Sequence, residues 1–193
     1  MKARVTPLVL ATLALFALFA LFADAPALAQ NGDPNEGFNG IAWGAQRKDQ
    51  KDFFRLKTKG NAAFYSNTRE NYFIKGYLPP KVLYGFINNK LFAVYIVIKD
   101  PTLYDYYDQK LQTEFGAPEV SRENDTLIRR WKSSAVKIKL KHNAKTGDMK
   151  LAYYSAPLSE QVDLEAVGDA FEDINRDKTD ELYRLEQWRR TDM

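Results

Sequence analysis

The stretch Val82-Leu-Tyr-Gly-Phe-Ile-Asn-Asn-Lys-Leu-Phe-Ala-Val-Tyr-Ile-Val-Ile98 decides the fold. Two runs of β-branched and aromatic residues, 82–87 and 91–98, flank the polar triplet Asn88-Asn89-Lys90. Such runs favour strands, and asparagine tolerates the positive φ angles that tight hairpin turns require. The stretch therefore predicts an antiparallel β-hairpin.

Both faces of this hairpin are apolar, so both need cover. Simple alternation places Leu83, Ile87, Val94, Ile96 and Ile98, with Phe92, on one face, and Val82, Tyr84, Phe86, Tyr95 and Val97 on the other. We expect the helix around Leu111 to cover one face. C-terminal helices cover the face with Tyr84, Phe86 and Tyr95, or else these three side chains form an exposed aromatic binding surface.

The residues after the hairpin predict a helix over 101–115. Asp100 is a good N-cap and Pro101 a good first residue, and Gly116 followed by Pro118 ends the pattern. The apolar residues Leu103, Tyr107, Leu111 and Phe115 repeat at helical spacing. One side of this helix should therefore pack on the sheet.

Shorter patterns complete the expected elements. We expect strands at residues 38–43, 62–66, 72–77, 126–132, 136–140 and 149–154, and helices at 45–54, 158–174 and 179–190. Residues 136–140 alternate Val-Lys-Ile-Lys-Leu, which is typical of a half-buried strand. Tight connections between strands favour antiparallel pairing.

The fold class follows as α+β, an antiparallel sheet with helices on one face and acidic C-terminal helices. The order of elements admits two tandem α-β-β-β units, residues 38–99 and 100–157, within one domain of residues 38–157. Residues 158–193 form the C-terminal helical segment.

The first residues predict export. Residues 1–29 combine a basic start, an apolar core at 8–22 and Ala27-Leu28-Ala29, which is typical of a cleaved signal peptide. The alternative is an uncleaved anchor, but a spanning helix needs about 20 apolar residues. We expect a flexible leader at residues 30–37, a periplasmic or secreted mature protein, and no stable membrane anchor after cleavage.

Part of the chain resembles a family of envelope proteins. Residues 111–118 end in Phe-Gly-Ala-Pro, and Trp131, an alternating strand, a glycine-bearing turn and a last strand follow. This arrangement resembles the small envelope proteins of the outer-membrane-assembly type (SmpA/OmlA-like) over residues 100–155. Members of that family are usually lipid-anchored through a cysteine, and this chain has none. The whole layout of the chain, including residues 40–44 and 84–86, also resembles uncharacterised exported bacterial proteins, which implies a location and a fold but no reaction.

The charges are distributed unevenly. Residues 30–158 carry 21 Lys and Arg against 13 Asp and Glu, whereas residues 159–193 carry 5 against 11. If Val136, Ile138 and Leu140 face inward, then Lys137, Lys139 and Lys141 face outward, and Arg130, Lys132 and Lys150 can join them. Such a face is either solvated or binds phospholipid headgroups, an acidic partner or the acidic tail. Export makes nucleic acid the poorest candidate, and we expect none.

The sequence indicates no catalytic, metal or cofactor residues. The single histidine, His142, has no cysteine and no G-x-S-x-G motif to accompany it, and we expect a solvated turn residue. Residues 173–184 begin like a calcium loop, but Lys178 stands where Gly is needed and Arg184 where the bidentate Glu is needed.

Two hypotheses for the function follow. The first is a non-catalytic exported module that binds an envelope protein or a small ligand, with Tyr84, Phe86, Tyr95, Arg130, Lys137 and Lys139 as candidate binding residues. The alternative is an envelope hydrolase that uses paired carboxylates. A deep pocket with clustered acids would indicate the enzyme, and an aromatic or basic surface would indicate the binding module.

Overall fold

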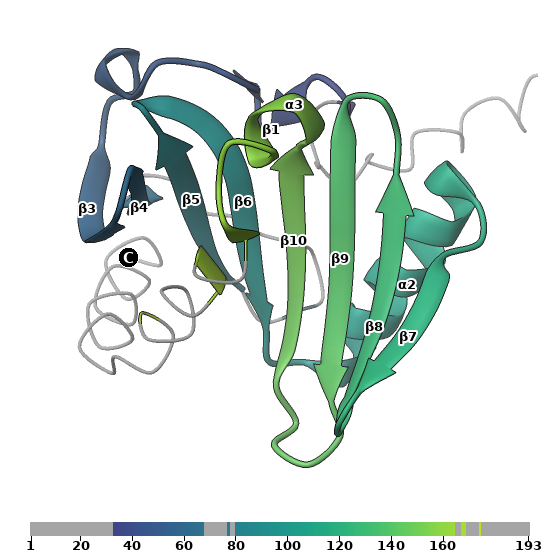
Figure 1. Cartoon of the computed structure of the whole chain (residues 1–193). Helices are drawn as coiled ribbons and strands as arrows, with labels where there is room; N and C mark the ends of the chain where they lie inside the picture. Colours follow the sequence, from purple (N-terminus) through teal and green to yellow (C-terminus); the bar gives the residue numbers. More distant parts are fainter. Residues whose placement is uncertain (1–32, 68–76, 78–79, 165–166, 169–173, 175–193) are drawn as a thin grey trace, which may run out of the picture.

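The computed structural model describes residues 33–67, 77, 80–164, 167–168 and 174. They form an α+β fold on a large antiparallel sheet with strand order β3-β4-β5-β6-β10-β9-β8-β7 (Figure 1). The strands of this sheet are β3 Phe53–Lys59, β4 Ala62–Asn67, β5 Lys81–Ile87, β6 Lys90–Ile98, β7 Glu119–Glu123, β8 Thr126–Lys132, β9 Val136–Asn143 and β10 Met149–Ser155.

The sheet consists of two four-stranded meanders. β3 to β6 form the first, β7 to β10 form the second, and the last strands of the two, β6 and β10, pair in the middle of the sheet. In the described residues each meander therefore contains four strands, one more than the α-β-β-β pattern predicted. The two strands that the sequence did not predict, β3 and β7, are the two edges of the sheet.

Helices cover both faces of the sheet, which corrects the expectation of helices on one face. The long helix α2, Pro101–Phe115, begins as predicted, since the Asp100 carboxylate accepts the Thr102 N–H at 2.9 Å. Leu103, Tyr107 and Leu111 of α2 pack on one face. The short helix α3, Ala156–Ser159, lies on the opposite face (Figure 1).

The hairpin pairs in a register that differs from simple alternation. Asn88 and Asn89 both have positive φ, 48° and 63°, so they form a two-residue turn. The pairing then shifts by one residue beside Gly85, because Phe92 bulges out of the ladder. As a result Tyr84 lies opposite Val94, where an unshifted hairpin would place Ala93. A shift of one residue exchanges the two faces, and Tyr84 and Tyr95 therefore lie on opposite faces of the sheet.

The chain before the sheet forms paired backbone where residues 45–54 predicted a helix. The two-residue strands β1 Gly37–Phe38 and β2 Ile41–Ala42 pair with each other, and only η2, Arg47–Asp49, is helical. The residues that follow β2 form backbone hydrogen bonds with the start of β6. For example, the Gly44 N–H donates to the Leu91 carbonyl oxygen at 2.9 Å. These bonds to the hairpin replace the internal bonds that a helix would make.

The C-terminal segment is described only in part. In place of a continuous helix over 158–174, α3 ends at Ser159, and Leu164, Val167, Gly168 and Ile174 are helical. Val167 and Ile174 are buried against the face that carries Tyr95. The predicted signal peptide at 1–29, the helix at 179–190 and the calcium-like residues 173–184, apart from Ile174, lie outside the described residues, as does nearly all of the strand expected at 72–77. No helix in the described part is long and apolar enough to cross a membrane.

Candidate functional site

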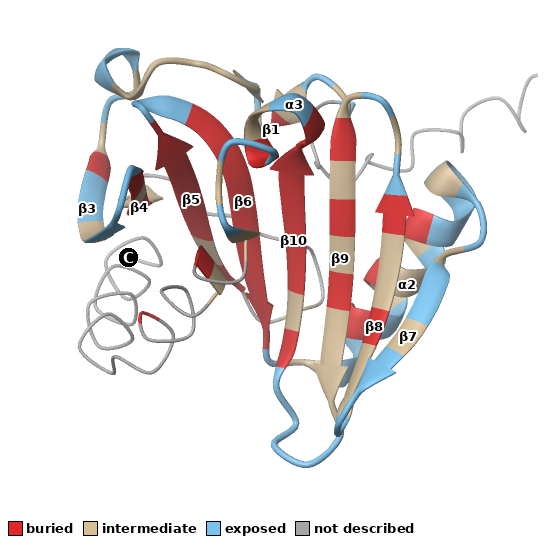
Figure 2. Ribbon diagram, viewed as in Figure 1, coloured by how far each residue is buried: buried red, intermediate tan, exposed pale blue. Residues whose placement is uncertain are grey.

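The three aromatic candidates lie in the core. Tyr84, Phe86 and Tyr95 are 0%, 1% and 2% exposed. Tyr84 and Phe86 pack edge-on against Phe53 on the α2 face, at centroid distances of 4.9 and 5.8 Å. Figure 2 shows β6 as buried after its first residue, from Leu91 to Ile98. The expectation of an exposed aromatic surface is therefore wrong for these residues, because both faces of the hairpin have cover.

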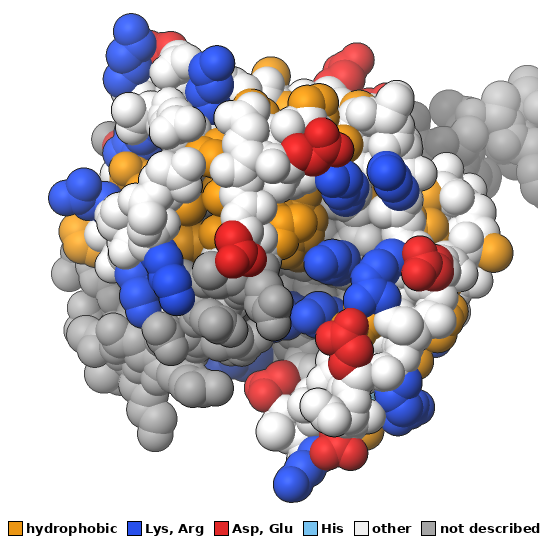
Figure 3. Space-filling model, in the orientation of Figure 1, with side chains coloured by type: hydrophobic (Ala, Val, Ile, Leu, Met, Phe, Trp, Pro, Cys, Tyr) orange, Lys and Arg blue, Asp and Glu red, His pale blue; other side chains and the backbone are white. Residues whose placement is uncertain are grey.

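The basic candidates come together on the other face of the sheet. We call this set the basic face, and it comprises Arg130 and Lys132 of β8, Lys137, Lys139 and Lys141 of β9, and Lys150 of β10. In β9, buried Val136, Ile138 and Leu140 alternate with the half-buried lysines, as the sequence predicted. Figure 3 shows Lys and Arg side chains gathered over β8 and β9, beside an apolar region over β6 and β10.

The strand register places these cations directly opposite one another. Lys132 pairs with Lys137 and Arg130 pairs with Lys139 across β8 and β9. Lys141 pairs with Lys150 across β9 and β10. Directly opposed like charges destabilise an antiparallel pair, and here three such pairs follow one another along β9. The fold therefore bears an electrostatic cost at this face.

Two carboxylates partly neutralise the rim of the basic face. Glu123 of β7 accepts a 2.9 Å hydrogen bond from the Arg130 guanidinium, whose other nitrogen donates to the Ser121 hydroxyl. Glu160 lies 3.5 Å from the Lys137 ammonium. Lys139 and Lys141 form no ion pair with a carboxylate of the described residues. Positive charge therefore remains at the centre of the face.

Burial and neighbouring positive charges lower the pKa values of two lysines of the basic face. Burial lowers the pKa of Lys139, and the charges of Lys141 and Arg130 lower it further. Burial and the charge of Lys141 lower the pKa of Lys150 to about 8, against the opposing effect of Asp148. An anion bound beside Lys139 would oppose the effect of the neighbouring positive charges, because an opposite charge favours the charged form of an ammonium group.

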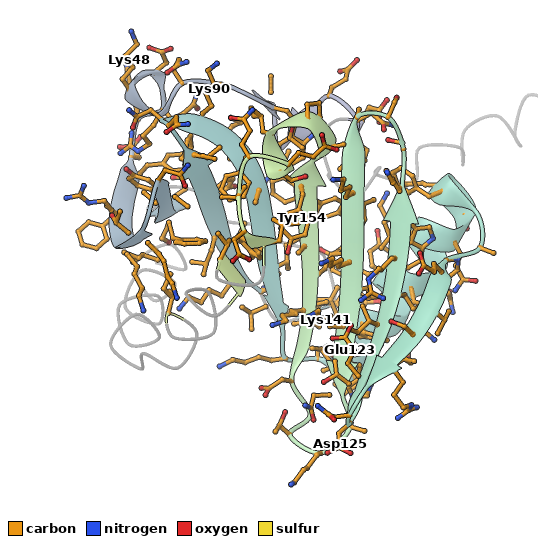
Figure 4. All side chains as sticks on the ribbon, viewed as in Figure 1. Lys48, Lys90, Glu123, Asp125, Lys141 and Tyr154 are labelled. Atoms are coloured by element: carbon orange, nitrogen blue, oxygen red, sulfur yellow. The ribbon has the colours of Figure 1, made fainter. Side chains whose placement is uncertain are left out.

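An aromatic side chain borders the basic face. The Lys139 ammonium lies 5.8 Å from the ring centroid of Tyr154, within the range of a cation–π contact. Tyr154 also packs edge-on against Tyr95 at 5.7 Å, and burial raises the pKa of Tyr154 to about 12. Figure 4 labels Tyr154 on β10 and Lys141 on the neighbouring strand β9. Tyr154 thus connects the basic face, through Lys139, to the apolar core around Tyr95.

His142 belongs to a different cluster, on the α2 face. Its ring lies 5.3 Å from that of Tyr104, so it is a helix-packing residue where a solvated turn residue was expected. The Tyr104 hydroxyl accepts a 2.8 Å bond from Arg129, whose Nε lies 3.2 Å from Asp108 Oδ1. These contacts join α2 to β8 and β9. They indicate that Arg129 and Asp108 have a structural role.

In the described part of the chain, the carboxylates near the sheet do not support the paired-carboxylate hypothesis. Asp108 and Glu123 each face an arginine. Among the described residues, no three His, Asp or Glu side chains lie close enough together to hold a metal ion.

Sequence reasoning identified Arg130, Lys137 and Lys139 but did not foresee the opposed pairs. Parity along one strand is visible in the sequence, whereas pairing depends on the register with its neighbours. The turn at residues 143–147 could have predicted one of these pairs, because the length of the turn determines the register that places Lys141 opposite Lys150. No protein-family model, curated protein or solved structure matches this chain.

Proposed function

We propose that this protein is an exported, non-catalytic module of the cell envelope that binds an anionic ligand or partner on its basic face. The single observation that carries the proposal is the set of three opposed cation pairs, Lys132–Lys137, Arg130–Lys139 and Lys141–Lys150. Local departures from favourable packing or pairing are expected mainly where function requires them. An anionic ligand would convert this electrostatic cost into binding energy.

We also infer that the two meanders are tandem copies of one unit. The mirrored strand order, and a helical segment before each meander, support this. C-terminal residues, among them Val167 and Ile174, cover the first meander on the face that carries Tyr95. In the second meander, the basic face occupies the corresponding position on the same face of the sheet. The comparison of the two halves therefore favours the basic face as the position for an external partner.

Salt elution from an immobilised sulfated polysaccharide tests anion binding. The double variant Lys137→Glu/Lys139→Glu should elute at clearly lower salt than the wild type. The matched control is Lys48→Glu/Lys90→Glu, which changes the net charge equally at two exposed lysines away from the basic face (Figure 4). Equal losses in the two variants would indicate a net-charge effect and would contradict the proposed site.

Export forms the other part of the proposal and rests on the signal-peptide pattern of residues 1–29. N-terminal sequencing of protein recovered from the periplasm or medium should give Gln30 as the first residue. Full-length protein that starts at Met1 and fractionates with membranes would contradict the predicted cleavage.

A further inference from the structure

The three cation pairs form a track along β9. Lys137, Lys139 and Lys141 are two residues apart, so successive pairs lie about 7 Å apart and the track is about 14 Å long, at about 3.4 Å per residue. A single small anion can contact one or two pairs. A ligand that used all three pairs would carry several negative charges in a row.

Within the described residues, Glu123 and Glu160 meet cations of this track at its rim. All of the net negative charge of the tail lies in residues 159–174, which hold six Asp and Glu and no Lys or Arg. Val167 and Ile174 in this stretch are buried on the apolar half of the face, and Glu160 reaches Lys137 at the rim. Residues 175–193 hold five acidic and five basic residues. Lys139 and Lys141, at the centre of the track, form no ion pair with a carboxylate of the described residues, and charge complementarity therefore favours an anionic occupant there.

The type of cation favours phosphate over carboxylate. Five of the six cations of the basic face are lysines, and an ammonium is a compact point charge with three donors. Carboxylates are best recognised by the planar fork of arginine. The fork of Arg130, the arginine of the face, already donates to Glu123 and Ser121.

We propose that the basic face binds a linear chain of phosphate groups, which lies along β9 and contacts the three cation pairs in turn. This inference rests on the proposed function of anion binding and names its ligand class. The phosphate chain neutralises the charges of Lys139 and Lys141, and each contact releases counterions from the polyanion.

Calorimetric titration of the mature protein with inorganic phosphate, and with linear polyphosphates of graded length, tests the proposal. We expect affinity to increase at least 100-fold from inorganic phosphate to a polyphosphate long enough to span the track. For longer polyphosphates, the affinity per bound polyphosphate chain should stay constant. The logarithm of affinity should fall linearly with the logarithm of salt concentration. Lys141→Gln should reduce that slope by about 0.7–1, and Lys90→Gln should leave it unchanged.

The triple variant Lys137→Gln/Lys139→Gln/Lys141→Gln should lose the dependence on chain length. It should fold at least as stably as the wild type, because the opposed charges are removed. Circular dichroism and urea unfolding check this. Lys141→Gln and Lys139→Gln, each with one substitution, provide the test if the triple variant does not fold.

Other results would overturn the inference and leave the proposed function in place. These are equal affinity for phosphate and long chains, equal affinity for polyglutamate of matched length, tighter binding of single-stranded oligonucleotides, or binding to phosphatidylglycerol vesicles without binding to soluble chains. Each of these results overturns the inference alone only if substitutions in the basic face weaken the binding that is measured. If the wild type binds none of these anions, the inference and the proposed function are both wrong.

Discussion

The indole N–H of Trp131 donates a 2.9 Å hydrogen bond to the carbonyl oxygen of Gly116, the residue that caps the end of α2. Trp131 is 4% exposed and belongs to the core cluster on the α2 face of the sheet. Gly116 has a φ of 80°, where glycine is favoured. The bond thus joins the end of α2 to the C-terminal end of β8.

Trp131 should accordingly contribute both packing and a hydrogen bond to stability. Trp131→Ala should lower the free energy of unfolding by about 3–5 kcal/mol. Trp131→Phe keeps an aromatic ring but leaves the Gly116 carbonyl without its donor, so its cost should be about 1–2 kcal/mol. Urea unfolding measures both. Equal costs for the two variants would contradict a separate contribution from the hydrogen bond.

Gly85 and Phe92 determine the register of the central hairpin. A Cβ at Gly85 would lie 3.0 Å from Phe92 Cε1 and 3.3 Å from Ala93 Cβ. Phe92 is fully buried and has no room to move aside. We therefore expect Gly85→Ala to destabilise the protein by about 1–3 kcal/mol through overpacking.

A double-mutant cycle with Phe92→Leu tests this relationship. The smaller side chain should relieve the overpacking, so Gly85→Ala should cost at least 0.5 kcal/mol less, on the order expected for coupled neighbours, in the Phe92→Leu background. Additive costs would mean that Phe92 does not restrict position 85.

The bulge at Phe92 also explains which part of the fold the sequence could predict. Hairpin strands, turn asparagines and the Asp100 cap are local signals, and each appears in the structure. Without the bulge, the turn would place Tyr84 and Tyr95 on one face, as alternation predicted. The bulge depends on packing between Gly85 and Phe92, and alternation along a strand carries no sign of such a contact.

The missed edge strands have a different cause. β3 reads Phe-Phe-Arg-Leu-Lys-Thr-Lys and β7 reads Glu-Val-Ser-Arg-Glu. Charged residues are common on edge strands because they oppose pairing with other chains, and they weaken the apolar signal by which strands are recognised. β9, in the interior of the sheet, alternates strictly, which is why the lysines of the basic face could be predicted and the strand at its rim could not.

The C-terminal segment should stabilise the face that carries Tyr95. Ile174 is 6% exposed and its carbonyl accepts a 3.4 Å bond from the buried Lys81 ammonium. Ile174→Ala should cost about 2–4 kcal/mol, whereas Gln161→Ala, at an exposed position, should cost less than about 0.5 kcal/mol. Truncation after Leu158 should lower stability further and increase binding of a hydrophobic dye. A truncated protein of unchanged stability and dye binding would contradict this role.

Lys150 should give the stability of the protein a dependence on pH. Its pKa in the folded chain is about 8, below the ordinary value of 10.5. Below pH 8 the folded chain carries the cost of a charged, half-buried ammonium beside Lys141. Between pH 8 and about 10.4 the unfolded chain binds the proton and the folded chain does not, so this group makes the free energy of unfolding rise with pH.

Lys150→Met isolates this contribution, because methionine fills similar space without a charge. At pH 7 we expect the variant to be more stable than the wild type by about 1–2 kcal/mol, after allowance for solvent screening. The difference should shrink through pH 8–10 as the wild-type lysine loses its proton. Urea midpoints measured at intervals from pH 6 to 10 give the profile, with Lys90→Met as the control for losing one exposed positive charge. A difference that stays constant over this range would place the pKa of Lys150 outside it and would remove the case for charge crowding beside Lys141.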